Sequence, residues 1–175
     1  MLCAWAQILY GAALARSSPE SAIDLLAPLL PMWRSAQSNW MVSLTGVPLG
    51  ESYLHAGRLE EAQAILSEAI EAAGSSGLKF LHGSAHRLCG EVLLETGELE
   101  AARRHFTQAT SSLEKCKAEN EIALVHADFG RLNLRQGATG AAREHFTSAL
   151  QIFDRLGTLQ EPARVRAELP ALATP

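Results

Sequence analysis

The chain has 175 residues, of which 47% are apolar and 19% are charged, and its formal net charge at pH 7 is −4. This composition is typical of one globular domain and excludes a disordered chain. The acidic balance argues against a non-specific nucleic-acid binder, and no apolar run reaches the ~20 residues of a membrane-spanning helix. We therefore expect neither a nucleic-acid nor a membrane partner.

The N-terminal stretch MLCAWAQILYGAALARSS matches a secretory signal only in part. Ala13-Leu14-Ala15 has the pattern of a cleavage site, but no Lys or Arg precedes the apolar segment. The three cysteines, Cys3, Cys89 and Cys116, are odd in number and irregularly spaced, which is typical of a reduced intracellular protein. These features predict a cytoplasmic location.

The next feature is an internal repeat. The segment HRLCGEVLLETGELEAARRHFTQA from His86 and the segment HADFGRLNLRQGATGAAREHFTSA from His126 are identical at 11 of 24 positions. At the same spacing, the pattern continues backward to GVPLGESYLHAGRLEEAQAILSEA from Gly46 and, more weakly, to AQILYGAALARSSPESAIDLLAPL from Ala6. Self-similarity at one fixed period indicates a repeat architecture.

Each copy predicts two helices joined by a short turn. Apolar residues recur at helical spacing, and glycine stands just past the first helix at Gly57, Gly97 and Gly137, where a left-handed conformation is expected. In the first copy Ser18 is expected to cap the second helix, with Pro19 at its first position. Further prolines inside expected helices predict kinks or shortening at Pro28, Pro31 and Pro48.

The order of small and large residues resembles the tetratricopeptide repeat family over nearly the whole chain. The first-helix glycine falls on Gly50, Gly90 and Gly130, with Tyr10 departing, and the second-helix alanine falls on Ala22, Ala62, Ala102 and Ala142. The large position that follows holds Leu26, Leu66, Phe106 and Phe146, and the next alanine holds Ala69, Ala109 and Ala149, with Leu29 departing.

The resemblance implies an all-α, right-handed superhelical solenoid of about four helix-turn-helix repeats in a single domain, 1–175. The repeats are expected at about 1–37, 38–77, 78–117 and 118–157, with a closing helix at 159–169. The common form of the family has a shorter period, of about 34 residues. The 40-residue period found here resembles the repeats of large bacterial regulatory proteins.

Motifs for catalysis are missing: the chain has no GxxxxGK[ST], HExxH, GxSxG or CxxC. The nearest metal-like cluster is His82, His86 and Cys89, but a fourth ligand is not evident and Cys89 occupies an expected core position. The pairs His86/His126 and His105/His145 recur with the repeat, which favours packing over catalysis. We therefore predict no enzyme, no catalytic residue, no metal and no cofactor.

The resemblance places a ligand groove on the first helices. Its positions are Gln7, Gly11, Ala15, Val47, Glu51, His55, Arg87, Glu91, Glu95, Asp128, Arg131 and Arg135, and the binding residues are predicted from Glu51 onward. Arginine binds carboxylates well, so the partner is expected to be a protein or peptide with an acidic or carboxy-terminal segment. The alternative is that these charges are solvated pairs along each helix.

The predicted function is a protein- or peptide-binding scaffold, the C-terminal docking or sensing arm of a larger bacterial signalling or transcription regulator. One alternative is a regulatory domain that binds a small signal molecule in the groove. Another is self-assembly: Leu2, Trp5 and Ile8 begin the chain as if a preceding element should cover them, so a homodimer through the N-terminal helix stays open.

Overall fold

The computed structural model describes residues 3–158 and 161–169. These residues form α1 (Ala4–Leu14), α2 (Pro19–Leu26), the 3-10 turn η1 (Ala27–Leu29), α3 (Leu30–Ser35), α4 (Asn39–His55), α5 (Leu59–Ser75), α6 (Lys79–Thr96), α7 (Leu99–Lys115), α8 (Glu119–Arg135), α9 (Thr139–Leu156) and α10 (Glu161–Glu168). The predicted all-α solenoid is confirmed. The start expected for the closing helix, 159–160, lies outside the described residues. None of the described helices combines the length and apolar character needed to cross a membrane.

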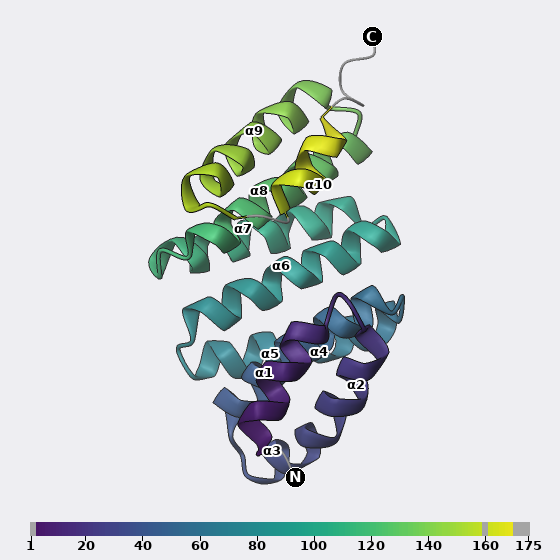
Figure 1. Cartoon of the computed structure of the whole chain (residues 1–175), viewed down its shortest axis with the longest axis vertical. Helices are drawn as coiled ribbons and strands as arrows, with labels where there is room; N and C mark the ends of the chain where they lie inside the picture. Colours follow the sequence, from purple (N-terminus) through teal and green to yellow (C-terminus); the bar gives the residue numbers. More distant parts are fainter. Residues whose placement is uncertain (1–2, 159–160, 170–175) are drawn as a thin grey trace.

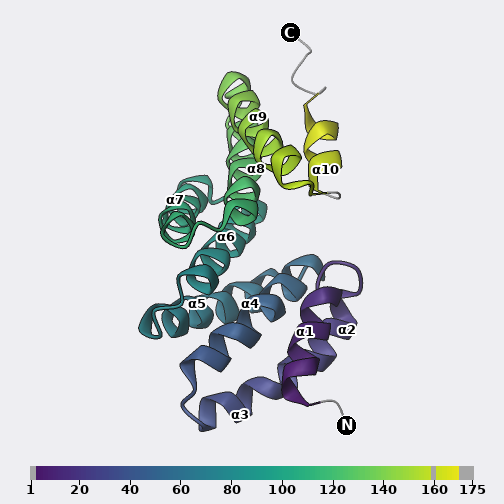
Figure 2. The same cartoon turned by 60° about the vertical axis from the view of Figure 1, so that its left-hand side comes forward.

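Consecutive helix pairs stack along the long axis of the molecule, from α1 and α2 at the lower end to α8 and α9 at the upper end (Figure 1). Figure 2 shows that the array bends, so that α1, α2 and α10 lie on the same side of it. The strongest packing lies within the pairs α4 with α5, α6 with α7 and α8 with α9.

Left-handed turns recur twice in each sequence period. Backbone φ is positive at Gln37, Gly57, Gly77, Gly97, Lys117, Gly137 and Gly157. After α4, the N–H of Arg58 donates to the carbonyl of Tyr53 at 2.9 Å, and that of Gly57 donates to Leu54 at 3.0 Å. This pair of hydrogen bonds is the Schellman motif, which satisfies carbonyls left free at a helix end. The predicted left-handed glycines are confirmed, and the same motif also joins one pair to the next.

Close packing inside each pair depends on glycine in the first helix. A Cβ built on Gly90 would stand 2.3 Å from Cε1 of Phe106, and one on Gly130 would stand 2.5 Å from Cε1 of Phe146. Both rings are fully buried. The family's small-and-large pattern therefore works as expected, because the missing methyl group is the space that the ring occupies.

The first copy follows the pattern in a different register. A Cβ on Gly11, rather than on Tyr10, would meet Leu26 at 2.6 Å. The spacing from Gly11 to Gly50 is one residue shorter than the sequence period, whereas Ala22 and Leu26 keep the full period. The turn after α1 is therefore one residue shorter, and no positive φ occurs between Ala15 and Ser18. The expectation that Tyr10 takes the glycine position was wrong.

The prolines act differently in the two helices that contain them. The second helix of the first copy stops at Leu26, continues as a 3-10 turn through Pro28 and restarts with Pro31 at an early position of α3. The predicted shortening is confirmed there. α4 runs through Pro48 as one helix, so it is not shortened at that residue. Pro19 opens α2 as expected, but the Ser18 side chain makes no capping hydrogen bond.

Candidate functional site

The first helices α1, α4, α6 and α8 together form a concave groove. An apolar cavity of about 360 Å³ occupies its N-terminal part. The apolar lining side chains are Ile8, Leu9, Ala12, Leu44, Val47, Pro48, Phe80, Leu81, Leu88 and Leu124. Two of these, Leu9 at 68% and Phe80 at 50%, remain exposed to solvent. Exposed apolar area within a concave surface is characteristic of binding sites.

Two residues that line this cavity each carry a buried donor that makes no hydrogen bond among the described residues. The Oγ of Ser84 and the Nε of Arg87 are buried without a hydrogen bond, and both residues line the cavity. The nearest acid to that Nε, Glu121, has its Oε2 at 3.5 Å in an ion pair. Native proteins rarely leave buried donors unsatisfied, so such atoms need an explanation.

Arg87 is also the centre of the charges in the groove. Its side chain is 5% exposed, and its Nη1 contacts the Glu91 carboxylate and lies 3.3 Å from Oδ2 of Asp128. Burial opposes its charge, but the surrounding carboxylates outweigh burial and raise the pKa of Arg87. Asp128 is shared with Arg131, whose Nη1 lies 2.7 Å from Oδ1. Burial and the neighbouring Glu91 nevertheless raise the pKa of Asp128.

The C-terminal part of the groove is a second cavity, of about 300 Å³. It is lined by Leu54, His55, Glu91, Leu94, Glu95, Asp128, Arg131 and Arg164. The last of these belongs to α10, which therefore closes this end of the groove. Arg131 Nη2 holds Glu168 of α10 at 2.8 Å.

Arg16 connects the two ends of the array. Its Nε lies 2.6 Å from Oε1 of Glu51, and its Nη1 lies 2.6 Å from Oε1 of Glu161 at the start of α10. Burial raises the pKa of Glu51, but His55, Arg87 and Arg16 lower it more strongly, to about 2. The pair with Glu161 joins the turn after α1 to the start of α10, which lies on the same side of the array as α1 (Figure 2).

Comparison with known proteins agrees with this architecture. The sequence model of the tetratricopeptide repeat family matches residues 42–115. Residues 42–115 belong to the tetratricopeptide repeat family. No curated protein matches the sequence. The family in general consists of non-catalytic scaffolds that bind proteins or peptides.

Two solved structures show the same fold as this tetratricopeptide repeat chain. BtubC (BKLC) from P. vanneervenii is 17% identical, with a TM-score of 0.68 over 97% of this chain and 80% of that chain. A putative kinesin light chain with nearly identical TPR-like repeats, from Podosopora anserina, is 12% identical, with a TM-score of 0.66 over 95% of this chain and 92% of that one. At these identities the likeness concerns the fold.

Seven of the eight predicted binding residues of the tetratricopeptide groove line its cavities: Glu51, His55, Arg87, Glu91, Glu95, Asp128 and Arg131. Arg135 lies beside them, donating to Oε1 of Glu95 and to the carbonyl of Leu94, each at 3.1 Å. Arg87 is buried rather than solvated, and it pairs with acids of both α6 and α8. Solvated pairing along one helix therefore does not describe it.

The one-residue register change moves the groove positions of the first tetratricopeptide copy. Gly11 and Ala15 are buried, whereas Ile8, Ala12 and Arg16 line the cavity. Each of these three stands one residue after a predicted position. The sequence signal for this register change is the turn at Arg16-Ser17-Ser18, which is shorter and lacks the glycine of the other copies.

The repeated histidines of this tetratricopeptide array pair across the two helices of a repeat. His86 and His105 approach with their Nδ1 atoms 3.1 Å apart, and His126 and His145 approach at 3.2 Å. Burial lowers the pKa of all four, that of His86 to about 4. Cys89 is buried, and burial raises its pKa to about 12. Among the described residues, no three such side chains are arranged to hold a metal ion.

Proposed function

We propose that the concave groove binds an extended or helical segment of a partner protein and that the chain is a non-enzymatic scaffold. The observation that carries this proposal is the apolar cavity, in which Leu9 and Phe80 stay exposed and whose lining includes Ser84, a residue whose hydroxyl group makes no hydrogen bond among the described residues. A peptide places apolar side chains and carbonyl oxygens at short, regular distances, so it can fill such a cavity and offer an acceptor to the Ser84 hydroxyl group.

The ion pairs refine the expected chemistry of the partner. The terminal nitrogens of Arg87 and Arg131 already contact carboxylates, so an acidic segment has to compete with them. A neutral carbonyl meets no such competition at Ser84. The acidic or carboxy-terminal segment expected from the arginines stays a prediction. The apolar lining of the N-terminal cavity supports a segment with at least two large apolar side chains.

A random-peptide display selection tests this function. The groove variant carries Leu9→Glu and Phe80→Glu, and the matched control carries Met32→Glu and Leu156→Glu, which are exposed apolar residues outside both groove cavities. We expect enriched peptides to lose binding to the groove variant and to keep binding to the control. Libraries with free and with blocked carboxy termini test the expected terminal segment. Equal binding by both variants would remove the groove from the proposal.

A single substitution separates binding from folding at the same site. Ser84→Ala removes a buried donor that has no partner among the described residues, so stability is expected to stay the same or rise. Affinity for a selected peptide is expected to fall about tenfold, the worth of one hydrogen bond. Unchanged affinity would show that the peptide does not reach this donor.

A small signal molecule is the second candidate occupant. The cavity of about 360 Å³ is within the range of sites that hold such ligands. A metabolite that raises the unfolding temperature of the wild type, but not of the Leu9→Glu and Phe80→Glu variant, would favour this function over peptide binding.

Self-assembly through the first helix is a separate proposal. Trp5 and Tyr10 are half exposed at the N-terminal end, whereas Ile8 is 2% exposed, so the expectation that Ile8 is uncovered was wrong. Leu2 lies outside the described residues. Tyr10 is exposed, whereas Leu49, its counterpart in the shifted register of the first copy, is buried in the N-terminal core with Leu26 of α2. Light scattering of the wild type and of Tyr10→Ser at high concentration tests whether this face joins two copies.

We also propose that the chain is the docking or sensing arm of a larger cytoplasmic regulator in a bacterium. The 40-residue period supports the regulator, and the three free cysteines support a reducing compartment. The reading frame of the transcript, together with fractionation of the source cells, tests both statements.

A further inference from the structure

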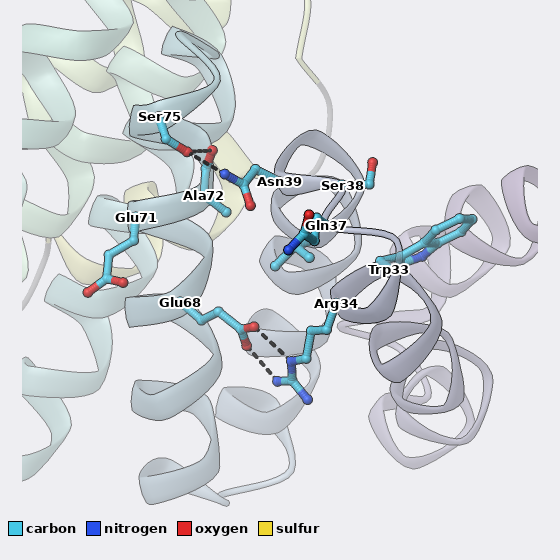
Figure 3. A pocket seen from close by; sticks show the side chains of 10 residues that line it. Trp33, Arg34, Gln37, Ser38, Asn39, Glu68, Glu71, Ala72 and Ser75 are labelled. Atoms are coloured by element: carbon cyan, nitrogen blue, oxygen red, sulfur yellow. Dashed lines mark hydrogen bonds and ion pairs between the residues drawn. The ribbon is translucent and has the colours of Figure 1, made fainter.

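The turns between repeats produce a recurring cleft on the surface, outside the groove. In the first occurrence the turn before α4 meets the end of α5, and the cleft is lined by Trp33, Arg34, Gln37, Ser38, Asn39, Val42, Glu68, Glu71, Ala72 and Ser75. Its polar side chains bond to one another across the cleft (Figure 3). Arg34 forms two hydrogen bonds with Glu68, at 2.7 and 2.6 Å, and Asn39 donates to Ser75 at 2.9 Å.

The next cleft lies one repeat further along the chain and has a different charge. It is lined by Ala73, Gly74, Gly77, Leu78, Lys79, His82, Gln108, Ser111, Ser112 and Lys115. The positions of Asn39 and Ser75 are now Lys79 and Lys115, two like charges. The positions of Arg34 and Glu68 are Gly74 and Gln108, so the ion pair of the first cleft has no counterpart.

The same two positions in the following repeat form a bonded pair again. Here the two positions hold Glu119 and Arg155, whose Oε2 and Nη1 lie 3.0 Å apart. The two neighbouring repeats thus have a bonded pair at these positions, whereas this repeat has two lysines. The chain has only three lysines, Lys79, Lys115 and Lys117, and two of them face this one cleft. Among the described residues, no Asp or Glu lines it.

The remaining side chains of the cleft are suited to an anion. Ser111 and Ser112 supply hydroxyl groups, and Gln108 supplies an amide. His82 Nδ1 lies 2.9 Å from the Oγ of Ser112. Burial, followed by the charges of Lys79 and Lys115, lowers the pKa of His82. The ring of His86 is also close to that of His82, with centroids 4.6 Å apart.

We propose that the cleft formed by Lys79, His82, Ser112 and Lys115 is a binding site for a phosphate monoester dianion. The cleft volume of about 130 Å³ admits a group the size of a few water molecules, each ~30 Å³, which suits a compact tetrahedral oxyanion. Such a ligand gives each of the two lysines a charge-assisted contact. It also supplies an acceptor for the hydroxyl groups. The group belongs either to a free small molecule or to a phosphorylated side chain of a partner protein.

Titrations followed by NMR of the folded chain test the site. The probes are inorganic phosphate, a phosphoserine peptide and sodium chloride at matched ionic strength. We expect saturable amide shifts at Lys79 and Ser112 with both phosphates, and a rise in the His82 pKa when phosphate binds. Lys79→Gln or Lys115→Gln is expected to weaken binding at least about tenfold, because each removes a charge-assisted contact.

Lys117→Gln is the matched control, because it removes the same charge two residues from Lys115 and does not line the cleft. Shifts that follow ionic strength alone, or equal weakening by Lys117→Gln, would overturn the proposal. A phosphoserine peptide that binds at least tenfold more tightly than inorganic phosphate identifies a protein segment as the source, and equal affinities identify a small molecule.

A charge reversal supplies an independent measurement. Lys79→Glu recreates the arrangement of Glu119 and Arg155, so this variant is expected to melt at a higher temperature than the wild type and to lose phosphate binding. A lower melting temperature would show that the two lysines do not repel each other across the cleft.

Discussion

Adding one methyl group at Gly90 is expected to destabilise the protein, although alanine is the better helix former. In the interior of a helix, Gly→Ala alone gains ~1 kcal/mol. At Gly90 the new Cβ would lie 2.3 Å from Cε1 and 2.5 Å from Cδ1 of Phe106. Carbon atoms pack at ~3.5–4.0 Å, so the ring has to move by more than ~1 Å in a fully buried site. Overpacking of this kind costs ~1–3 kcal/mol, which exceeds or cancels the gain.

Gly140 in α9 provides the matched control, because a Cβ added there would meet nothing within 4 Å. Gly140→Ala is expected to be neutral or stabilising, up to ~1 kcal/mol. Urea unfolding followed by circular dichroism gives both free energies of unfolding. Gly90→Ala should fall below Gly140→Ala by ~1–3 kcal/mol. If both variants are stabilised alike, the close approach of ring and backbone is not what requires glycine.

A double-mutant cycle isolates the contact itself. Phe106→Ala leaves a cavity and costs ~3–5 kcal/mol. In the double variant the methyl group of Gly90→Ala enters that cavity, so the two costs should fall short of additivity by ~0.5–3 kcal/mol. Strict additivity would refute the direct contact.

Three further predictions concern the charged centre, the turns and pH. Arg87→Ala leaves the buried Asp128 carboxylate with Arg131 alone and removes the counter-charge of Glu91, so it is expected to cost ~3–5 kcal/mol. Arg135→Ala, at a 45% exposed side chain, is expected to stay within ~0.5 kcal/mol, and urea unfolding measures both. Both Gly97 and Lys117 have positive φ, which glycine adopts more easily than other residues. Gly97→Ala should therefore lower the free energy of unfolding by ~1 kcal/mol, and Lys117→Gly should raise it by ~1 kcal/mol. Thermal melts check that the two melting temperatures shift in opposite directions. The pKa of His86 is about 4 in the folded protein, below the 6.5 of the unfolded chain, so its stability contribution is complete above pH 6.5 and is lost as pH falls toward 4. Unfolding free energies at pH 7 and 5 should therefore differ less in His86→Gln than in the wild type. The raised pKa of Asp128 has the opposite effect on stability: its contribution to the free energy of unfolding grows as pH falls over this range.

The candidate site was predictable to the extent that it repeats. Glu51, Glu91 and Arg131 occupy one position in three successive copies, and the structure places all of them in the groove cavities. Arg16 lines the same groove but was missed, because its turn is one residue shorter and the alignment of the first copy slips. A copy that matches the others only weakly has a register that sequence spacing alone leaves open.

The sequence by itself determined the helix pairs, their glycine turns and the small-and-large packing of Gly90 against Phe106. These features depend on contacts within one repeat, and the residue pattern that produces them recurs from repeat to repeat. Only the tertiary structure decided that Arg87 is buried and that Arg16 reaches Glu161. It also decided that Lys79 and Lys115 share a cleft. Such contacts join different helices or opposite ends of the array, and their geometry follows from the bend accumulated over all the repeats rather than from any local pattern.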